Sequence, residues 1–258
     1  PKYIIDPDPE LTAQLLEICK GYALTMTLAP EKDKAYGPGS VAEVLIKGGA
    51  LPSWGHTDSG SAPAREALEF SRKAIKETTN PRSARATITH LFNGMRPLHH
   101  RDTGPIGEFL SDAARDGVIA EMICDGVHLD PSLVRDVYEM LGRDSCVFVT
   151  DAMEAAGMPN GTYELGSQRV DVKDGYAYIA GTTTLAGGTA HLLDCVRVAT
   201  FTGGIDLVDA VFMATVQGAR ILGRNDIGKL EAGMRADVLE LDEQLRPQRV
   251  WRGGTLVK

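Results

Sequence analysis

The sequence predicts an α/β fold of the (β/α)8 barrel type, followed by a short β region. Short apolar segments typical of buried strands alternate with amphipathic segments typical of helices, which indicates a parallel sheet with crossover helices. Polar residues follow several of these apolar segments directly, and the C-terminal strand ends form the active-site mouth of such a barrel. From residue 226 onward the helical pattern gives way to short β segments separated by glycine turns.

The barrel elements can be placed in chain order. Leu11, Leu15 and Ile18 lie on one side of a helix expected at residues 11–22. Further helices are expected at 41–46, 62–78, 106–112, 131–141, 189–200 and 207–221. Strands are expected at 24–28, 50–55, 86–91, 119–124 and 146–150, the second of them short because it contains a proline.

The remaining strands are predicted from turns. Segments 163–172 and 176–179 flank Lys173-Asp174-Gly175, and Asp-Gly is a strong hairpin signal. In the tail, strands are expected at 238–241, 249–251 and 255–257, between glycines.

Composition excludes several function classes. The 258 residues carry a net charge of −8, which argues against binding to nucleic acid or to a membrane surface, because both require clustered positive charge. No apolar run approaches the roughly 20 residues of a membrane span. The four cysteines form no CxxC pair, which favours buried free thiols and a cytoplasmic protein.

Two histidines at predicted strand ends suggest a metal site. His56 and His90 lie among small residues rather than on an apolar face. Neutral imidazoles are favoured ligands of zinc and similar divalent ions. Either histidine alone could instead be a hydrogen-bonded loop residue, but the pair together with Asp151 favours metal binding.

Asp151 and His128 are the other candidates for chemistry. Asp151 follows a buried strand, so its carboxylate could cap a helix or act as a general base beside a metal-bound water. The presence of the two histidines favours the base. His128 could be a third ligand, a loop residue or a substrate contact; we favour the substrate contact, because a hydrolytic metal keeps an open position.

Two loops are candidates for substrate binding. Asn93 and Gly94 could bind sugar hydroxyls or phosphate, and Arg101 offers a fork of donors that fits phosphate, although it could also be a solvated surface residue. The turn formed by Leu185, Ala186 and Gly187 could hold a substrate oxygen with its N–H groups. His99 and His100 are expected at the surface, and Glu31 is expected to be structural.

Several of these segments together resemble the N-acetylglucosamine-6-phosphate deacetylases of the amidohydrolase superfamily. The resemblance covers nearly the whole chain. Its segments are TLAPE at 27–31, GHTD at 55–58, THLFNGM at 89–95, DGVH at 125–128, VTDAM at 149–153, TLAG at 184–187 and GKLEAGMRAD at 228–237. The last marks only the superfamily, whereas 90–95 and 125–128 point to this member.

The resemblance implies a fold and a site. The fold would be a metal-bearing barrel at 1–225, incomplete at its N-terminus, with residues 226–258 forming the C-terminal part of a small β-sandwich. His56 and His90 match two ligands of a divalent ion, most often zinc, with iron, manganese or cobalt as alternatives. Asp151 matches the general acid/base. The substrate-binding positions would be Asn93, Gly94, Arg101, His128, Leu185, Ala186 and Gly187.

The activity implied is hydrolysis of the acetamide of N-acetylglucosamine 6-phosphate by a homodimer, in which Arg101 would reach a phosphate across the dimer interface. The chain departs from the family pattern at the front, because a Glu ligand in a His-x-Glu-Gly-Pro-like segment and a following His are absent. We therefore expect the chain to be a piece of something longer. Two alternatives remain: another amidohydrolase that acts on a cyclic or linear amide, and a non-catalytic barrel scaffold.

Overall fold

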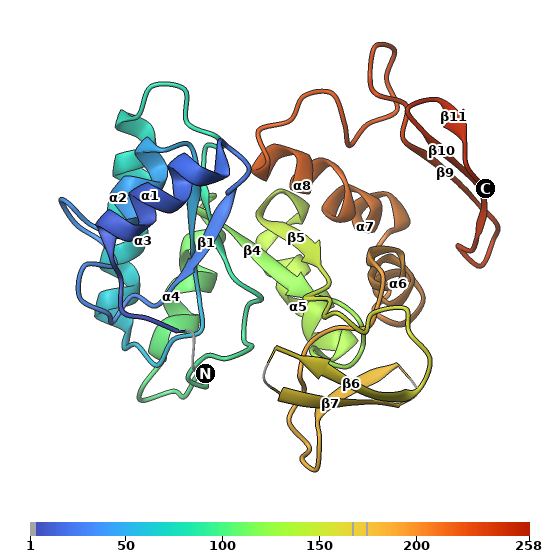
Figure 1. Ribbon diagram of the computed structural model, residues 1–258, viewed down its shortest axis with the longest axis horizontal. Coiled ribbons are helices and arrows are strands. Elements are labelled where there is room, and N and C mark those ends of the chain that lie inside the picture. The colour runs from blue at the N-terminus through green and yellow to red at the C-terminus, as the bar shows by residue number, and fades with distance from the viewer. Residues whose placement is uncertain (1–3, 167, 174) are drawn as a thin grey trace. The chain divides into compact units, whose positions relative to one another are not determined.

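The computed structural model describes residues 4–166, 168–173 and 175–258 (Figure 1). The chain forms two compact units. The first contains the residues up to Glu121 together with 220–223, and the second contains 122–219 together with 224–258.

The first unit is a parallel sheet in which a helix lies between successive strands of the chain. Its strands are β1 (Thr25–Leu28), β2 (Leu51–Trp54), β3 (Ala86–Ile88) and the first four residues of β4 (Val118–Ile123), which pair in chain order. Its helices are α1 (Pro9–Cys19), α2 (Val41–Lys47), α3 (Ser61–Glu77) and α4 (Gly104–Ala113). Asp8 and Ser40 cap α1 and α2 by accepting hydrogen bonds from backbone N–H groups of the first turn.

The two faces of this sheet differ in polarity because successive side chains of a strand alternate. Trp54, which is fully buried, donates from Nε1 to Ser71 Oγ on α3 at 3.1 Å, so this face of β2 lies against the helices. Leu28 and Ile88 are level with Trp54 on the adjacent strands. Ser53 and Thr87 point to the opposite face, which corresponds to the interior of a barrel.

A buried carboxylate fastens α3 to α4. Asp112 is fully buried and accepts hydrogen bonds from Arg72 of α3 and from Arg115 Nε at 3.1 Å. One turn away, Arg65 donates to both oxygens of Glu108 at 2.8 and 2.9 Å. These charge-assisted bonds fix the two helices against each other on the outer side of the sheet.

The second unit continues the sheet and adds two small antiparallel sheets. The strand β5 (Cys146–Val149) follows β4 in the sheet order. The helical elements are α5 (Pro131–Leu141), η1 (Arg143–Ser145), α6 (Leu192–Arg197), η2 (Val198–Thr202), α7 (Leu207–Ala214) and α8 (Val216–Ile221). One small sheet contains β6 (Gly161–Leu165), β7 (Gln168–Lys173) and β8 (Tyr176–Ile179); the other contains β9 (Val238–Leu241), β10 (Pro247–Arg252) and β11 (Thr255–Leu256).

The parallel order confirms the predicted α/β barrel class, and most element positions agree with the prediction. Three details were wrong. The segment 163–172 is not one strand, because the chain turns at Gly166, which has a φ of +58°. The helix predicted at 189–200 starts at Leu192 and continues as the π-helix η2. The helix predicted at 207–221 breaks at Thr215, whose φ of −131° is not helical.

The predicted turn at 173–175 is described only in part, and the predicted domain boundary is not tested. Lys173 pairs with Tyr176, as a hairpin requires, whereas Asp174 of the predicted turn lies outside the described residues. The boundary between barrel and sandwich at 225/226 stays a prediction. Over the described part of the chain, no helix is both long and apolar enough to cross a membrane.

Candidate metal and catalytic site

His56 and His90 converge on one point in the first unit. Their Nε2 atoms lie 2.8 Å apart and their rings meet edge to face, with centroids separated by 4.6 Å. Nitrogens bound to one zinc ion at about 2.0–2.1 Å in tetrahedral geometry would lie roughly 3.3 Å apart, so a small rotation of the rings would admit an ion. The donor chemistry therefore fits a divalent cation.

The backbone at both histidines adopts a conformation that L-residues rarely use. Each lies two residues after its strand, and φ is +47° at His56 and +26° at His90. Asp151, two residues after β5, also has a φ of +47°. Such strain costs about 1–3 kcal/mol per residue and is concentrated at functional sites. All three predicted residues therefore share a local geometry that directs the side chain sharply away from its strand.

Two glycines make room for the histidine pair. A Cβ at Gly55 would lie 2.8 Å from Thr89 Cβ, so this glycine allows the ends of β2 and β3 to approach closely. A Cβ at Gly94, which has a φ of +60°, would lie 2.8 Å from His56 Nδ1. Gly94 thus packs under the His56 ring, and its predicted contact with substrate stays a prediction.

Glu31 is structural, as the sequence indicated. Its carboxylate accepts hydrogen bonds from Thr57 Oγ1 and from the backbone N–H of Asp58, at 3.1 Å for the latter. These bonds hold the loop that follows His56. The same loop borders a hollow of about 520 Å³. Its lining residues are Ile4, Glu31, His56, Thr57, Asp58, Gly94, Met95, Arg96 and Pro97.

The other predicted substrate residues of this unit have different surroundings. Asn93 is half-buried, and its amide donates to the carbonyls of His90 and Leu91 at 3.3 Å, which stabilises the loop after His90. Arg101 is exposed on a tight turn closed by two backbone bonds between His99 and Asp102. His99 and His100 are exposed, which confirms their predicted surface position.

In the second unit, Asp151 lies against the predicted 185–187 turn. The Asp151 carbonyl accepts a 2.6 Å hydrogen bond from the N–H of Gly188, and a Cβ at Gly187 would lie 3.1 Å from that oxygen. No helix starts at Asp151, so the capping alternative is excluded. Its side chain is exposed, and none of the described residues hydrogen-bonds to its carboxylate.

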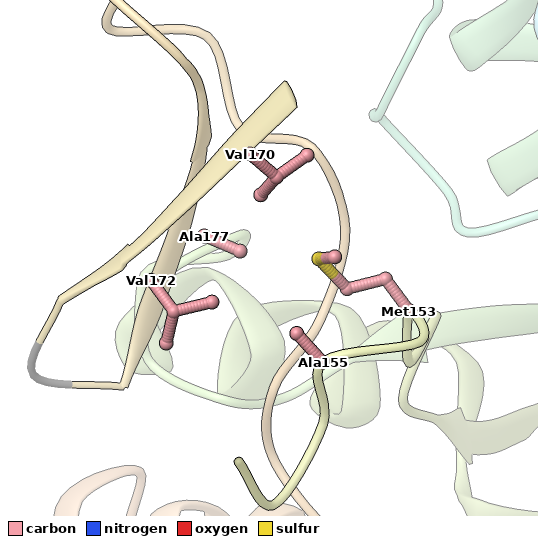
Figure 2. Close-up of a cluster of buried hydrophobic side chains, with 5 residues drawn as sticks. All are labelled: Met153, Ala155, Val170, Val172 and Ala177. Carbon is pink, nitrogen blue, oxygen red and sulfur yellow. The ribbon is translucent and has the colours of Figure 1, made fainter. Parts of the chain in front are cut away.

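A small hydrophobic cluster holds the chain beyond Asp151 in place. Figure 2 shows Met153 and Ala155 pointing toward Val170, Val172 and Ala177 of the β6–β8 sheet. All five side chains are buried. Burial of apolar groups contributes roughly 25 cal/mol per Å², so this packing stabilises the position of the segment after Asp151 on the β6–β8 sheet.

His128 forms a pair with Asp125, a residue that the sequence analysis missed. Asp125 Oδ2 lies 2.7 Å from His128 Nδ1, and both side chains are buried. Burial alone would raise the pKa of Asp125, but hydrogen bonds from the His128 side chain and from two backbone N–H groups lower it. The carboxylate fixes the orientation of the ring through Nδ1, and the predicted contact of His128 with substrate stays a prediction. The spacing Asp-x-x-His after a strand was the available signal.

The cysteines are free, as predicted. Burial raises the pKa of the Cys124 thiol and raises that of Cys195 to about 12, so neither is a reactive thiolate at neutral pH.

A profile of the amidohydrolase family matches residues 65–257. The chain belongs to the amidohydrolase family. Enzymes of this family generally use a divalent metal ion, and the described residues contain no group of three or more His, Cys, Asp or Glu that could hold one. Within the region described, the assignment of His56 and His90 as metal ligands stays a prediction.

Named relatives are similar over most of the chain. An N-acetylglucosamine-6-phosphate deacetylase of Rattus norvegicus is 35% identical over 235 residues, which cover 90% of this chain and 53% of the relative. An N-acetylgalactosamine-6-phosphate deacetylase of Escherichia coli O157:H7 is 32% identical, covering 94% of this chain and 59% of the relative. The chain thus spans about half to three-fifths of these proteins.

A solved structure also has a similar fold. The crystal structure of a mutant N-acetyl-D-glucosamine-6-phosphate deacetylase from Mycobacterium smegmatis, in complex with N-acetyl-D-glucosamine-6-phosphate, superimposes with a TM-score of 0.85. It is 35% identical, and the match covers 100% of this chain and 63% of that one. This confirms the predicted fold class.

The contact between Gly94 and His56 can be tested by mutation. Gly94→Ala should weaken Co²⁺ binding by about tenfold or more, because the new methyl group would displace the His56 ring. Gly21→Ala is the matched control: Gly21 has a φ of +86° but no atom within 4 Å of its Cβ position. Titration followed by cobalt absorption measures the difference; equal affinity of the two variants would contradict the prediction.

The Asp125–His128 pair predicts a pH effect. A lowered pKa means that the Asp125 carboxylate stabilises the fold above its ordinary value of 3.8 and that this contribution is lost as the pH falls through the folded-state pKa. Asp125→Asn should therefore lower the free energy of unfolding by about 1–3 kcal/mol at pH 7, and by progressively less below pH 3.8. Urea unfolding at several pH values checks this, with the exposed Asp136→Asn as control. A pH-independent difference would exclude ionisation as the cause.

Proposed function

We propose that this chain carries the central catalytic residues of a deacetylase that hydrolyses N-acetylglucosamine 6-phosphate to glucosamine 6-phosphate and acetate. The observation that carries the proposal is the convergence of His56 and His90 in a chain that superimposes over its whole length on a deacetylase crystallised with this sugar phosphate. Asp151 lies two residues after β5, and none of the described residues hydrogen-bonds to its carboxylate; we propose that it acts at the same site.

The ion is proposed to be zinc, since two imidazole nitrogens are donors that zinc favours. When bound, the ion would supply Lewis acidity and lower the pKa of a water molecule. A hydrolytic zinc site usually has three protein ligands, so at least one ligand beyond His56 and His90 is required. The proposed activity therefore requires a further ligand in addition to these two histidines.

The chain's own residues would carry the proton transfers. Asp151 would accept a proton from the attacking water as the new C–O bond forms. The same carboxyl group would then donate that proton to the amine nitrogen as the C–N bond breaks, which releases acetate and the free amine. The Asp151 side chain is exposed and accepts no hydrogen bond from the residues that the structure describes, which supports this exchange.

Substrate recognition is proposed to involve both loops and the Asp–His pair. His128, oriented by Asp125, would offer Nε2 to the sugar, and the Leu185–Gly187 turn would contact it beside Asp151. Asn93 and the Gly94 backbone would bind from the His90 side. Arg101 is exposed on a tight turn, which supports its proposed role of reaching a phosphate in a homodimer partner.

The free cysteines support a cytoplasmic location for the proposed enzyme. Its four cysteines are free, and three of them are buried, as is typical of proteins kept in a reducing compartment.

Asp151→Asn should reduce deacetylation by at least 10³-fold while leaving Co²⁺ affinity within about twofold, because the amide cannot exchange a proton but is not a ligand. Assays use the product of the whole reading frame that encodes the chain, and acetate release is the measurement. Asp33→Asn, which makes the same change at an exposed position, is the control. Unchanged turnover of the Asp151 variant would refute its role.

Arg101→Ala should raise KM for N-acetylglucosamine 6-phosphate by about 10- to 100-fold and leave KM for unphosphorylated N-acetylglucosamine nearly unchanged, since only the former loses a charge-assisted contact. Arg135→Ala on the exposed face of α5 is the control. Equal effects on both sugars would favour an amidohydrolase of different specificity. Parallel assays with N-acetylgalactosamine 6-phosphate test the alternative that the second relative's name supports.

A further inference from the structure

The interior face of the first unit contains a hydrogen-bonded chain of hydroxyl groups that ends at a carboxylate. Ser53 is at its centre. Ser53 Oγ donates to Glu121 Oε1 at 3.3 Å and accepts from Thr87 Oγ1 at 2.7 Å. It also lies 2.6 Å from Thr89 Oγ1, which in turn lies 3.1 Å from Thr27 Oγ1.

The hydrogen atoms in this chain can be assigned. A hydroxyl has one hydrogen to donate and two lone pairs to accept with. The hydrogen of Ser53 is directed to Glu121, so the bond between Ser53 and Thr89 must be donated by Thr89. The hydrogen of Thr89 is then committed, so Thr27 donates to Thr89. Every O–H in the series therefore points toward the Glu121 carboxylate.

The polarity of this hydroxyl series is unusual for the interior face of a barrel. Barrel interiors are dominated by bulky branched apolar residues, which pack without hydrogen bonds. Here Ser53 is 2% exposed and Thr87 is fully buried, and their bonds join β2, β3 and β4 across the sheet. A buried polar network fixes a single arrangement of strands, because any slip would leave its groups unsatisfied.

The hydroxyl series lies next to the histidine pair. Thr89 immediately precedes His90, and its Cβ occupies the space that a side chain at Gly55, next to His56, would need. The Glu121 carbonyl also accepts the N–H of Leu91, on the other side of His90, at 2.8 Å. Both neighbours of His90 thus contact this hydroxyl series or Glu121, and Gly55, which precedes His56, lies against Thr89.

We propose that Glu121, acting through Ser53 and Thr89, is a positioning residue for the His56–His90 pair: it fixes the ends of β2 and β3 at the spacing at which both imidazoles can bind one divalent cation. This inference rests on the metal site of the proposed function. It assigns Glu121 no contact with the metal or the substrate.

Two pairs of variants, made in the product of the whole reading frame that encodes the chain, test the proposal. Thr89→Val and Thr87→Val each remove one hydroxyl that donates to Ser53, and only Thr89, which is half-buried, adjoins His90. Glu121→Gln removes the charge of the carboxylate at the end of the hydroxyl series. Glu69→Gln makes the same change at an exposed position of α3. Melting temperatures report on the cost to the fold of each change.

Co²⁺ alone is the probe, followed by its absorption bands, with Zn²⁺ competition as a second measurement. Thr89→Val and Glu121→Gln should weaken Co²⁺ binding by about tenfold or more, the range typical of groups that support metal ligands. Thr87→Val and Glu69→Gln should stay within about twofold of the wild type. Equal weakening in Thr87→Val and Thr89→Val, or wild-type affinity in Glu121→Gln, would overturn the proposal, since a merely structural network changes only the melting temperature.

A measurement without metal separates this inference from the proposed function. Long-range ¹H–¹⁵N spectra of the histidine rings report on the contact between the two Nε2 atoms. Thr89→Val and Glu121→Gln should shift the His56 and His90 signals, and both controls should leave them unchanged. If the wild type binds no Co²⁺ but these shifts occur, the metal function fails and the positioning stands. Unshifted rings would overturn the positioning, whatever the metal result.

Discussion

The candidate site depends on how two imidazoles are brought to the same point. His56 and His90 belong to neighbouring parallel strands, whose ends lie side by side, and each backbone turns through a left-handed conformation two residues after its strand. That conformation costs free energy, and the surrounding structure has to supply it. Gly55, Gly94 and the Glu31 contacts with the 57–58 loop are the features that make this geometry possible.

A left-handed residue after a strand also positions the candidate side chain of the second unit. Asp151 also follows its strand in a left-handed conformation, and its backbone is held by Gly188 and by the packing of Met153 and Ala155 on the β6–β8 sheet. The carboxylate itself makes no bond with the described residues. A side chain that is held by its backbone but free at its tip is suited to exchanging protons with a substrate.

The candidate residues for chemistry lie at the strand ends, whereas charged pairs on the helices join α3 to α4. Asp112 with its two arginines, and Glu108 with Arg65, join α3 to α4 on the side of the sheet away from Ser53 and Thr87. Polar groups on the interior face are linked to one another instead, up to the level of His90. This division between a supporting outside and a functional interior is typical of barrel enzymes.

By itself, the sequence determined the alternation of strands and helices and the location of His56, His90 and Asp151 at strand ends. These features are local, because hydrophobic period and turn residues are read within a few positions of the chain. The same local reading joined 163–172 into one strand and 207–221 into one helix, since neither the turn at Gly166 nor the break at Thr215 interrupts the apolar pattern strongly. Only the tertiary structure decided which distant residues meet. The contact of Gly94 with His56, the pairing of Asp125 with His128 and the series from Thr27 to Glu121 depend on loop conformation and on the register of strands up to 94 residues apart, and no short-range pattern specifies that register.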